Sequence, residues 1–237
     1  KKETKKVIFT DNITVDIKNF SYGDNDKFMI KDINLTINKG DKIGIIGASG
    51  SGKSTIIEIL LGILKPQKGD VKIDGNIIYK INNLKEMVGY IPQKIFILDD
   101  SLRNNILFGL KEDEYNDEKI IEIIKKTNLT GLLNRLENGL DSRLGERGLN
   151  LSGGEIQRIG IARTLIYDPE IIYLDEATSS LDTFTERAIL DELKSFGKKT
   201  FISVAHRMGT LKNCDKIYLI SKGKITDSGN FQKFTNY

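Results

Sequence analysis

The fold of this 237-residue chain is decided by the stretch Gly47-Ala48-Ser49-Gly50-Ser51-Gly52-Lys53-Ser54-Thr55. It matches the pattern G-x-x-x-x-G-K-[S/T], in which a glycine-rich turn leads into a helix. Glycines allow backbone N–H groups to turn inward around phosphates, and the N-terminus of the helix adds partial positive charge. Lys53 would supply a mobile cation, and the Ser54 hydroxyl is a suitable ligand for Mg²⁺. The stretch therefore predicts a phosphate-binding loop.

Both flanks of this loop have the pattern that it requires. Residues 43–46 are a short apolar strand, and residues 54–64 have the apolar density of a helix. Farther along, the sequence predicts buried strands at residues 88–91, 171–174 and 201–204, with helical patterns between them. Strands that alternate with helices favour a parallel α/β core.

Two other regions have a different character. Apolar residues alternate at 15–17 and 33–37, which is typical of half-buried strands, whereas residues 101–167 have helical patterns. A further helix is predicted at residues 183–196, and two short strands close the chain around Gly223. We therefore expect an α/β P-loop NTPase core with a mostly parallel sheet, an N-terminal antiparallel β-subdomain and an inserted α-helical subdomain.

Composition limits the classes of protein that fit. The formal net charge of +3, from 36 basic and 33 acidic residues, is too small for a dedicated nucleic-acid binder, and we expect no nucleic-acid partner. The lone Cys214 cannot form a disulfide within the chain. No apolar stretch approaches the ~20 residues that span a bilayer, and the chain begins at Lys1, so we expect a fragment of a longer protein.

An acidic pair, Asp175 and Glu176, follows the apolar strand at residues 171–174. On its own, such a pair more often marks the acidic first turn of a helix. Next to a phosphate loop, we interpret Asp175 as the residue that holds Mg²⁺ through water. Glu176 is then the general base that activates the attacking water.

A second glycine pair lies in Leu151-Ser152-Gly153-Gly154, just before a helix that starts near Glu155. Backbone amides and the helix dipole make this a potential second anion site, although a plain helix cap explains it equally well. One nucleotide could hardly use both sites of one chain if they lie in different subdomains. This favours a dimer in which each nucleotide lies between opposite chains.

Together, the phosphate loop, the stretch Leu151-Ser152-Gly153-Gly154-Glu155-Ile156-Gln157-Arg158 and the Asp175-Glu176 strand resemble the nucleotide-binding domains of ABC transporters. The resemblance covers nearly the whole chain. It implies a domain that binds and hydrolyses ATP with Mg²⁺ at the cytoplasmic face of a membrane, which we expect to be the bacterial inner membrane. The implied partners are a second nucleotide-binding domain, in a homodimer or pseudo-dimer, and the transmembrane domain that it drives.

The resemblance also implies boundaries and a direction of transport. Residues 1–12 would be a linker from an upstream transmembrane domain, and residues 13–237 the nucleotide-binding domain, with its helical subdomain at about 94–168. The segments at residues 99–109 and 144–148 resemble those of exporters. Glu155 departs from the family, which more often has glutamine at that position.

Further site residues follow from the resemblance alone. Tyr22 matches the aromatic residue that stacks on adenine, Gln93 the glutamine that approaches Mg²⁺ and the water, and His206 the residue that contacts the γ-phosphate. Asp182 matches the acidic residue of a loop at the dimer interface, although an N-cap also explains it. The expected nucleotide contacts are Tyr22, Gly47, Ala48, Ser49, Gly50, Ser51, Gly52, Lys53, Ser54, Thr55, Ser152, Gly153, Gly154 and Asp182; the metal ligands are Ser54, Gln93 and Asp175; and the catalytic residues are Glu176, His206 and Gln93.

Three other classes of ATPase or GTPase fit the sequence less well. A soluble ABC ATPase that acts on DNA or the ribosome is disfavoured by the near-neutral charge and by the unbroken core. A separate ATPase subunit of an importer is disfavoured by the exporter-like segments and by the missing initiator methionine. A P-loop kinase or GTPase would leave Ser152–Gly154 and His206 unexplained. The substrate of transport lies beyond this sequence, because selectivity belongs to the membrane domain.

Overall fold

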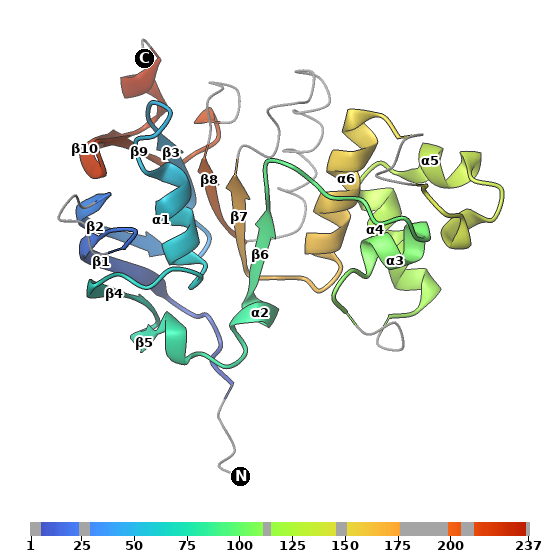
Figure 1. Ribbon diagram of the computed structural model, residues 1–237, viewed down its shortest axis with the longest axis horizontal. Coiled ribbons are helices and arrows are strands. Elements are labelled where there is room, and N and C mark those ends of the chain that lie inside the picture. The colour runs from blue at the N-terminus through green and yellow to red at the C-terminus, as the bar shows by residue number, and fades with distance from the viewer. Residues whose placement is uncertain are drawn as a thin grey trace. The chain divides into compact units, whose positions relative to one another are not determined.

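The chain forms two compact units (Figure 1). The computed structural model describes residues 6–23, 29–110, 115–145, 151–175, 199–204 and 211–235. The first unit contains Lys1–Gly89, Glu170–Glu176 and Lys198–Tyr237, and the second contains Tyr90–Pro169 and Ala177–Gly197. The predicted helix at residues 183–196 lies outside the described residues.

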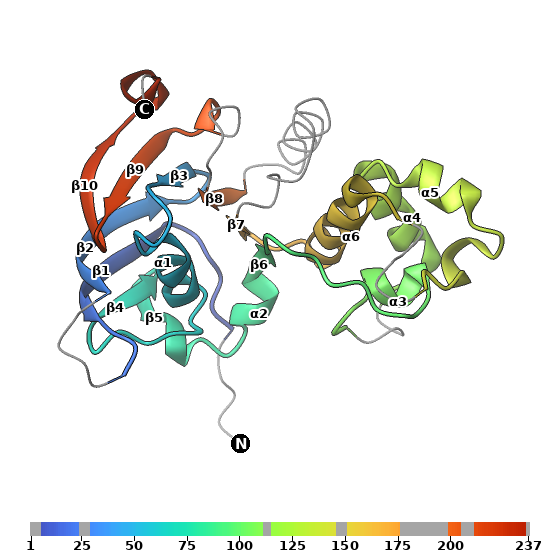
Figure 2. The same ribbon diagram turned by 45° about the horizontal axis from the view of Figure 1, so that its top comes forward.

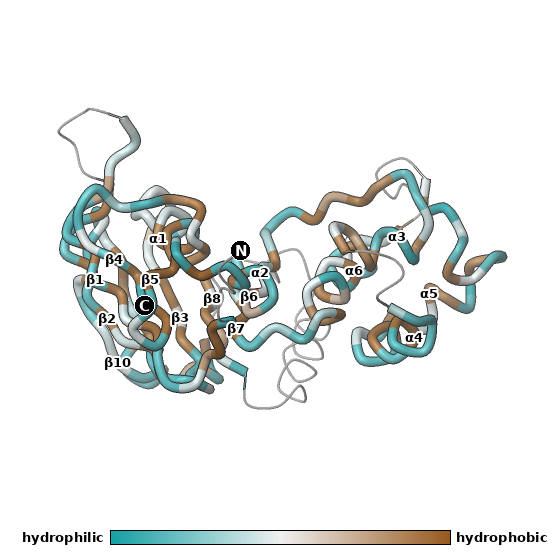
Figure 3. The backbone as a smooth tube through the Cα atoms, turned by 90° about the horizontal axis from the view of Figure 1, so that it is seen from below, coloured by the Kyte–Doolittle hydropathy of each residue, from teal (hydrophilic) through white to brown (hydrophobic). Residues whose placement is uncertain are grey.

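A six-stranded sheet in the order β10-β9-β3-β8-β7-β6 is built mostly from parallel strands. β3 pairs in parallel with β8 and β9, and β7 pairs in parallel with β8, whereas β10 is antiparallel to β9. Every residue of β8 is buried, and Figure 3 shows the chain around β7 and β8 as hydrophobic. The strands are β3 (Lys42–Ile46), β6 (Val88–Ile91), β7 (Ile171–Asp175), β8 (Thr200–Val204), β9 (Lys216–Ser221) and β10 (Lys224–Gly229). The predicted fold class is confirmed.

The alternating N-terminal segments form an antiparallel sheet in the order β2-β1-β4-β5. Its strands are β1 (Asn12–Phe20), β2 (Ile30–Asn38), β4 (Lys68–Ile73) and β5 (Asn76–Ile77). Ile13, Val15 and Ile17 of β1 are buried, and the residues between them are more accessible. The alternation of apolar and polar residues therefore arises because one face of this sheet packs on the core and the other is accessible to solvent.

Helix α1 (Lys53–Leu60) packs on β7 of the large sheet, and its N-cap Gly52 lies against β2 of the other sheet. The buried Tyr173 hydroxyl of β7 donates a hydrogen bond to the carbonyl oxygen of Leu60 at 3.2 Å, and a Cβ on Gly52 would lie 2.7 Å from Cδ1 of Ile30 in β2. The helix is shorter than the predicted range of 54–64. Gly62 adopts a left-handed φ of 73°, and the Ile63 N–H donates back to the carbonyl oxygen of Glu58, which ends the helix.

The hairpin of β9 and β10 lies beside β2, although about 190 residues separate them in sequence (Figure 2). The turn residue Gly223 accepts a hydrogen bond from Lys31 N–H and donates one to the carbonyl oxygen of Ser51. Its φ is 73°, and a Cβ there would lie 1.8 Å from the carbonyl oxygen of Met29. Only glycine allows this approach, which joins β2, the hairpin and the phosphate loop.

The first unit also contains three short helical segments, which are η1 (Ile78–Lys80), α2 (Leu84–Met87) and η5 (Phe231–Phe234). The second unit is helical, with α3 (Leu102–Ile106), α4 (Asp117–Lys126), α5 (Thr130–Arg135), η3 (Gly139–Asp141) and α6 (Gly153–Leu165). Ile120, Ile123 and Ile124 of α4 are buried, as the helical periodicity predicted. Within the described ranges, no helix has both the length and the hydropathy needed to cross a membrane.

A fully buried asparagine organises the helical unit. The Asn105 side chain donates to the carbonyl oxygens of Leu98 (3.1 Å) and Ser101 (2.9 Å), and it accepts from Leu98 N–H (2.9 Å). The Arg163 guanidinium of α6 donates to the same side chain at 2.8 Å. Burial lowers the pKa of Arg163 to about 10. Because a buried polar group without partners is costly, this network fixes the path of residues 98–101 against α3 and α6.

Candidate functional site

The phosphate loop runs from the end of β3 to the start of α1, as the motif requires. Gly52 is the N-cap of α1 and has a left-handed φ of 106°. Gly47 has a φ of 153°, and a Cβ there would lie 2.2 Å from the carbonyl oxygen of Ile220 in β9. The loop therefore depends on glycine at positions where the backbone passes very close to a neighbouring strand.

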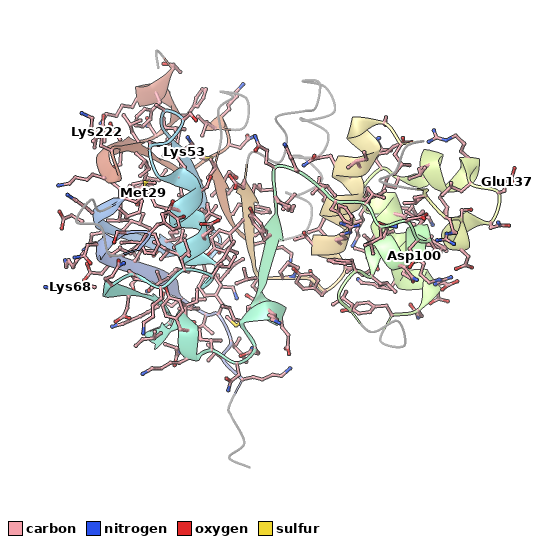
Figure 4. All side chains as sticks on the ribbon, in the orientation of Figure 1. Met29, Lys53, Lys68, Asp100, Glu137 and Lys222 are labelled. Carbon is pink, nitrogen blue, oxygen red and sulfur yellow. The ribbon has the colours of Figure 1, made fainter. Side chains whose placement is uncertain are left out.

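Lys53 folds back over this loop. It is the first residue of α1, where Figure 4 labels it. Lys53 is only 6% exposed. Its ammonium group donates hydrogen bonds to the carbonyl oxygens of Gly47 (2.8 Å) and Ala48 (3.0 Å). The positive charge consequently lies at the loop and at the N-terminus of the helix, which are two features that favour an anion.

Two serine hydroxyls of the loop are suited to a polyphosphate. The Ser51 hydroxyl is buried and has no hydrogen-bond partner in the described structure. Ser54, in the first turn of α1, is exposed. An unpartnered buried hydroxyl in a loop that already carries an ammonium group is a donor available to a phosphate oxygen.

Asp175 lies at the same edge of the large sheet as the loop. It pairs in register with Val204 of β8, and Val204 pairs with Ile45 of β3. Asp175 is thus two strand spacings, or about 10 Å of backbone separation, from the end of β3. Among the described residues, no group of three His, Cys, Asp or Glu side chains could hold a metal ion. The oxygens of Ser54 and Asp175 are suited to Mg²⁺ when phosphate oxygens complete the ligand set.

Three predicted site residues, Glu176, Asp182 and His206, lie outside the described residues. β7 ends at Asp175, one residue before Glu176, and β8 ends two residues before His206. Their roles therefore stay predictions.

Tyr22 is brought next to α1. Tyr22 follows β1 and is 53% exposed. Its ring packs edge to face with that of Phe20, with the ring centroids 5.0 Å apart. Its hydroxyl lies 3.2 Å from Oγ1 of Thr55 and donates to Oε2 of Glu58 at 3.0 Å. Glu58 is not among the site residues predicted from the sequence. Its spacing of three residues from Thr55 places both on one face of a helix, and this was the available signal.

The second glycine pair begins α6, in the helical unit. Ser152 is the N-cap, and it forms a capping box with Glu155, whose Oε2 accepts from Ser152 N–H at 2.8 Å. The Arg135 guanidinium of α5 donates to the other carboxylate oxygen at 2.9 Å. Burial acts to raise the pKa of Glu155, but the hydrogen bonds from Ser152 and Arg135 outweigh it and lower the pKa. Ser152 therefore does cap the helix. The capping box does not use the N–H groups of Gly153 and Gly154.

Gln93 belongs to the helical unit, as Ser152–Gly154 do, whereas the phosphate loop, Tyr22 and Asp175 belong to the first unit. Gln93 is exposed and follows β6. The chain beyond it packs tightly on α6, because a Cβ on Gly160 would lie 2.3 Å from Cδ1 of Ile95.

Comparison with known proteins agrees with this geometry. Residues 30–179 match the family described as ABC transporter. The chain is 38% identical over 226 residues to an export ATP-binding/permease protein of Rickettsia typhi, and 39% identical over 217 residues to the ATP-dependent lipid A-core flippase of Pectobacterium atrosepticum. It is 36% identical over 237 residues to the mitochondrial iron-sulfur clusters transporter of Saccharomyces cerevisiae.

The matched regions cover 93%, 90% and 97% of this chain but only 39%, 37% and 34% of these relatives, in the same order. A solved structure of a bacterial Atm1-family ABC exporter with ATP bound is also similar, with a TM-score of 0.89 and 33% identity. That match covers 98% of this chain and 41% of the exporter chain.

The glycines of the loop provide a paired test of its geometry. Gly47→Ala should lower the free energy of unfolding by at least about 3 kcal/mol, because its Cβ meets backbone at 2.2 Å. Gly50→Ala should lower the free energy of unfolding by only about 1 kcal/mol. Gly50 has a φ of 73°, but nothing lies within 4 Å of a Cβ added there. Urea unfolding measures both values. Equal losses would contradict the close approach at Gly47.

The capping box predicts a specific pH dependence. The folded-state pKa of Glu155 lies below its ordinary value of 4.5, so its stabilisation is fully present above that value and disappears as the pH falls through the folded-state pKa. At pH 7, Glu155→Gln should lower the free energy of unfolding by about 1 kcal/mol, and the difference from wild type should shrink below about pH 4.5.

The control is Glu137→Gln, which changes an exposed glutamate of the same unit (Figure 4). It should match wild type at every pH, because surface substitutions cost little. A difference for Glu155→Gln that stayed constant from pH 7 to pH 3 would show that the carboxylate charge has no role.

Proposed function

The chain belongs to the ABC transporter family as its ATP-binding domain, and from that premise we propose that it hydrolyses ATP to drive an exporter. The observation that carries the proposal is the shared sheet edge, where the phosphate loop with Lys53 and the carboxylate of Asp175 both lie. An ammonium group and inward N–H groups attract the phosphates, and a carboxylate at the same edge attracts a divalent cation.

Nucleotide binding is assigned to one chain of a dimer. The loop from Gly47 to Gly52 surrounds the β- and γ-phosphates, Lys53 offsets their charge, and the ring of Tyr22 stacks on adenine. Ser54, Asp175 and Gln93 are the residues that would hold Mg²⁺, which when bound neutralises charge on the phosphate oxygens.

Hydrolysis is assigned to residues that follow the strand ends. Glu176 accepts a proton from water as the water oxygen bonds to the γ-phosphorus and the bond to the bridging oxygen breaks, which yields ADP and phosphate. Gln93 orients the water. His206 contacts the γ-phosphate and helps to hold it in line.

The second chain completes the site. Ser152, Gly153 and Gly154 at the start of α6 supply amides and a helix N-terminus to the nucleotide of the opposite chain, and Asp182 lies at the interface. The chain has two helix N-termini suited to phosphate, at α1 and at α6. This supports the arrangement, because each chain then contributes to the binding of two nucleotides. The partner is a second nucleotide-binding domain, identical or homologous.

Export as the outcome is supported by the relatives. The Rickettsia protein is named as an export protein and the Pectobacterium protein as a flippase. This chain spans about two fifths of their lengths. The Rickettsia relative is named as an ATP-binding/permease protein, and the export proposal includes the same arrangement, with the membrane-spanning part in one polypeptide with this domain. The nucleotide-binding domain would then face the cytoplasm.

The assignment of the base predicts the behaviour of one variant. Glu176→Gln should bind ATP with nearly wild-type Kd, lose at least about 100-fold in kcat, and accumulate as an ATP-bound dimer on size-exclusion chromatography. The matched control is Glu170→Gln, at the opposite end of β7, where the carboxylate forms a partly exposed ion pair with Lys39. It should retain wild-type turnover. Normal hydrolysis by Glu176→Gln would refute the assignment of the base.

The export proposal predicts the size and location of the native protein. An antibody against this chain should detect, in membrane fractions of the source cells, a polypeptide much longer than 237 residues. Detection of a 237-residue protein in the soluble fraction would contradict a fused exporter and favour an ATPase without a role in transport.

A further inference from the structure

Tyr22 is anchored from several sides although more than half of its surface is exposed. Its backbone neighbour Ser21 is held twice by Gln67, which accepts from Ser21 N–H at 3.0 Å and donates to the Ser21 carbonyl oxygen at 2.9 Å. The Tyr22 ring also packs edge to face with the Phe20 ring. These contacts fix the base of the side chain and hold the ring against β1.

The tip of the ring is fixed by α1. The Tyr22 hydroxyl donates to Oε2 of Glu58 at 3.0 Å and lies 3.2 Å from Oγ1 of Thr55. An ionised carboxylate only accepts hydrogen bonds, so Glu58 sets the direction of the phenolic proton. Burial, assisted by Glu58 and opposed by Thr55, raises the pKa of Tyr22, so the hydroxyl remains a donor at neutral pH.

The anchoring helix is the one that begins at the phosphate loop. Thr55 and Glu58 are the third and sixth residues of α1, which puts them about 3 to 8 Å along the axis from its start. That distance is shorter than a nucleotide. The ring of Tyr22 is therefore placed beside the phosphate site at a distance that a base joined to those phosphates can reach.

We propose that Glu58 is a positioning residue that, through the hydroxyl of Tyr22, holds the aromatic ring ready for the nucleobase. The proposal rests on the proposed function, in which Tyr22 stacks on adenine. A ring that is already held in one orientation loses less conformational entropy when a base stacks on it, and this increases affinity. Glu58 itself need not touch the nucleotide.

The charge of Glu58 gives this role a recognisable signature. A carboxylate near the phosphate loop repels polyphosphate, so its removal by ordinary electrostatics should strengthen anion binding or leave it unchanged. Loss of positioning has the opposite effect, and only on ligands that carry a base. The two contributions can be separated by comparing ATP with inorganic tripolyphosphate, which has no base.

The test measures Kd values of the 237-residue chain for ATP, ADP and inorganic tripolyphosphate by calorimetry. Glu58→Ala and Tyr22→Phe should each raise the Kd for ATP and ADP about three- to tenfold, the effect of one hydrogen bond. The Kd for tripolyphosphate should stay the same or fall. Glu58→Gln, which keeps an acceptor oxygen, should recover most of the ATP affinity.

A double variant separates a shared role from two independent ones. Tyr22→Phe combined with Glu58→Ala should bind ATP no more weakly than either single variant, because both remove the same hydrogen bond. Additive losses would overturn the proposal. So would an unchanged ATP Kd in Glu58→Ala, or an equal loss of tripolyphosphate affinity, which would reveal damage to the loop.

Failure of the proposed function has a different outcome. If the wild-type chain bound ATP no more tightly than tripolyphosphate, the base would contribute nothing and the stacking role of Tyr22 would be wrong. If the base contributes in wild type but the Glu58 variants bind as wild type does, only the positioning role is wrong.

Discussion

The structure of the first unit depends on backbone segments that approach one another more closely than any side chain allows. Gly47 lies close to the backbone of Ile220 in β9, and Gly223 lies close to the backbone of Met29. Gly223 also accepts a hydrogen bond from Lys31 N–H in β2 and donates one to the carbonyl oxygen of Ser51. Both glycines have φ angles in the region that other residues avoid. These contacts join the antiparallel sheet, the final hairpin and the phosphate loop. The shape of the loop is thus imposed by its neighbours as much as by its own glycines.

Local patterns in the sequence were enough to predict most elements and the fold class. The loop motif with its apolar flank located β3 and α1, and the spacing of Ile120, Ile123 and Ile124 located α4. Contacts between distant segments could not be predicted in this way. The approach of Gly223 to β2 depends on strand order, and no local pattern encodes it. The early end of α1 depends on a left-handed Gly62, which the apolar pattern through residue 64 obscured.

The same contrast between local patterns and distant contacts applies to the residues of the candidate site. The positions of Lys53 and Asp175 could be predicted from sequence because a strand end fixes each of them, and parallel strands bring their ends to one edge. Glu58 could not, because its role depends on Tyr22 arriving from another strand. In the sequence, Glu155 is only a departure from the usual glutamine. In the structure, its carboxylate accepts a hydrogen bond from Arg135 of a different helix, which stabilises the start of α6. The roles of Glu176, Asp182 and His206 remain predictions.

The order in which the sheet is assembled has a consequence for synthesis of the protein. β3 carries the phosphate loop, yet both of its neighbours, β8 and β9, lie more than 150 residues later in the chain. During translation the loop motif therefore leaves the ribosome long before the strands that give it its shape. Long-range pairings of this kind form late and slowly. A nascent chain that stopped before the final hairpin would contain every motif residue of the loop but would lack the contacts that hold it open for phosphate.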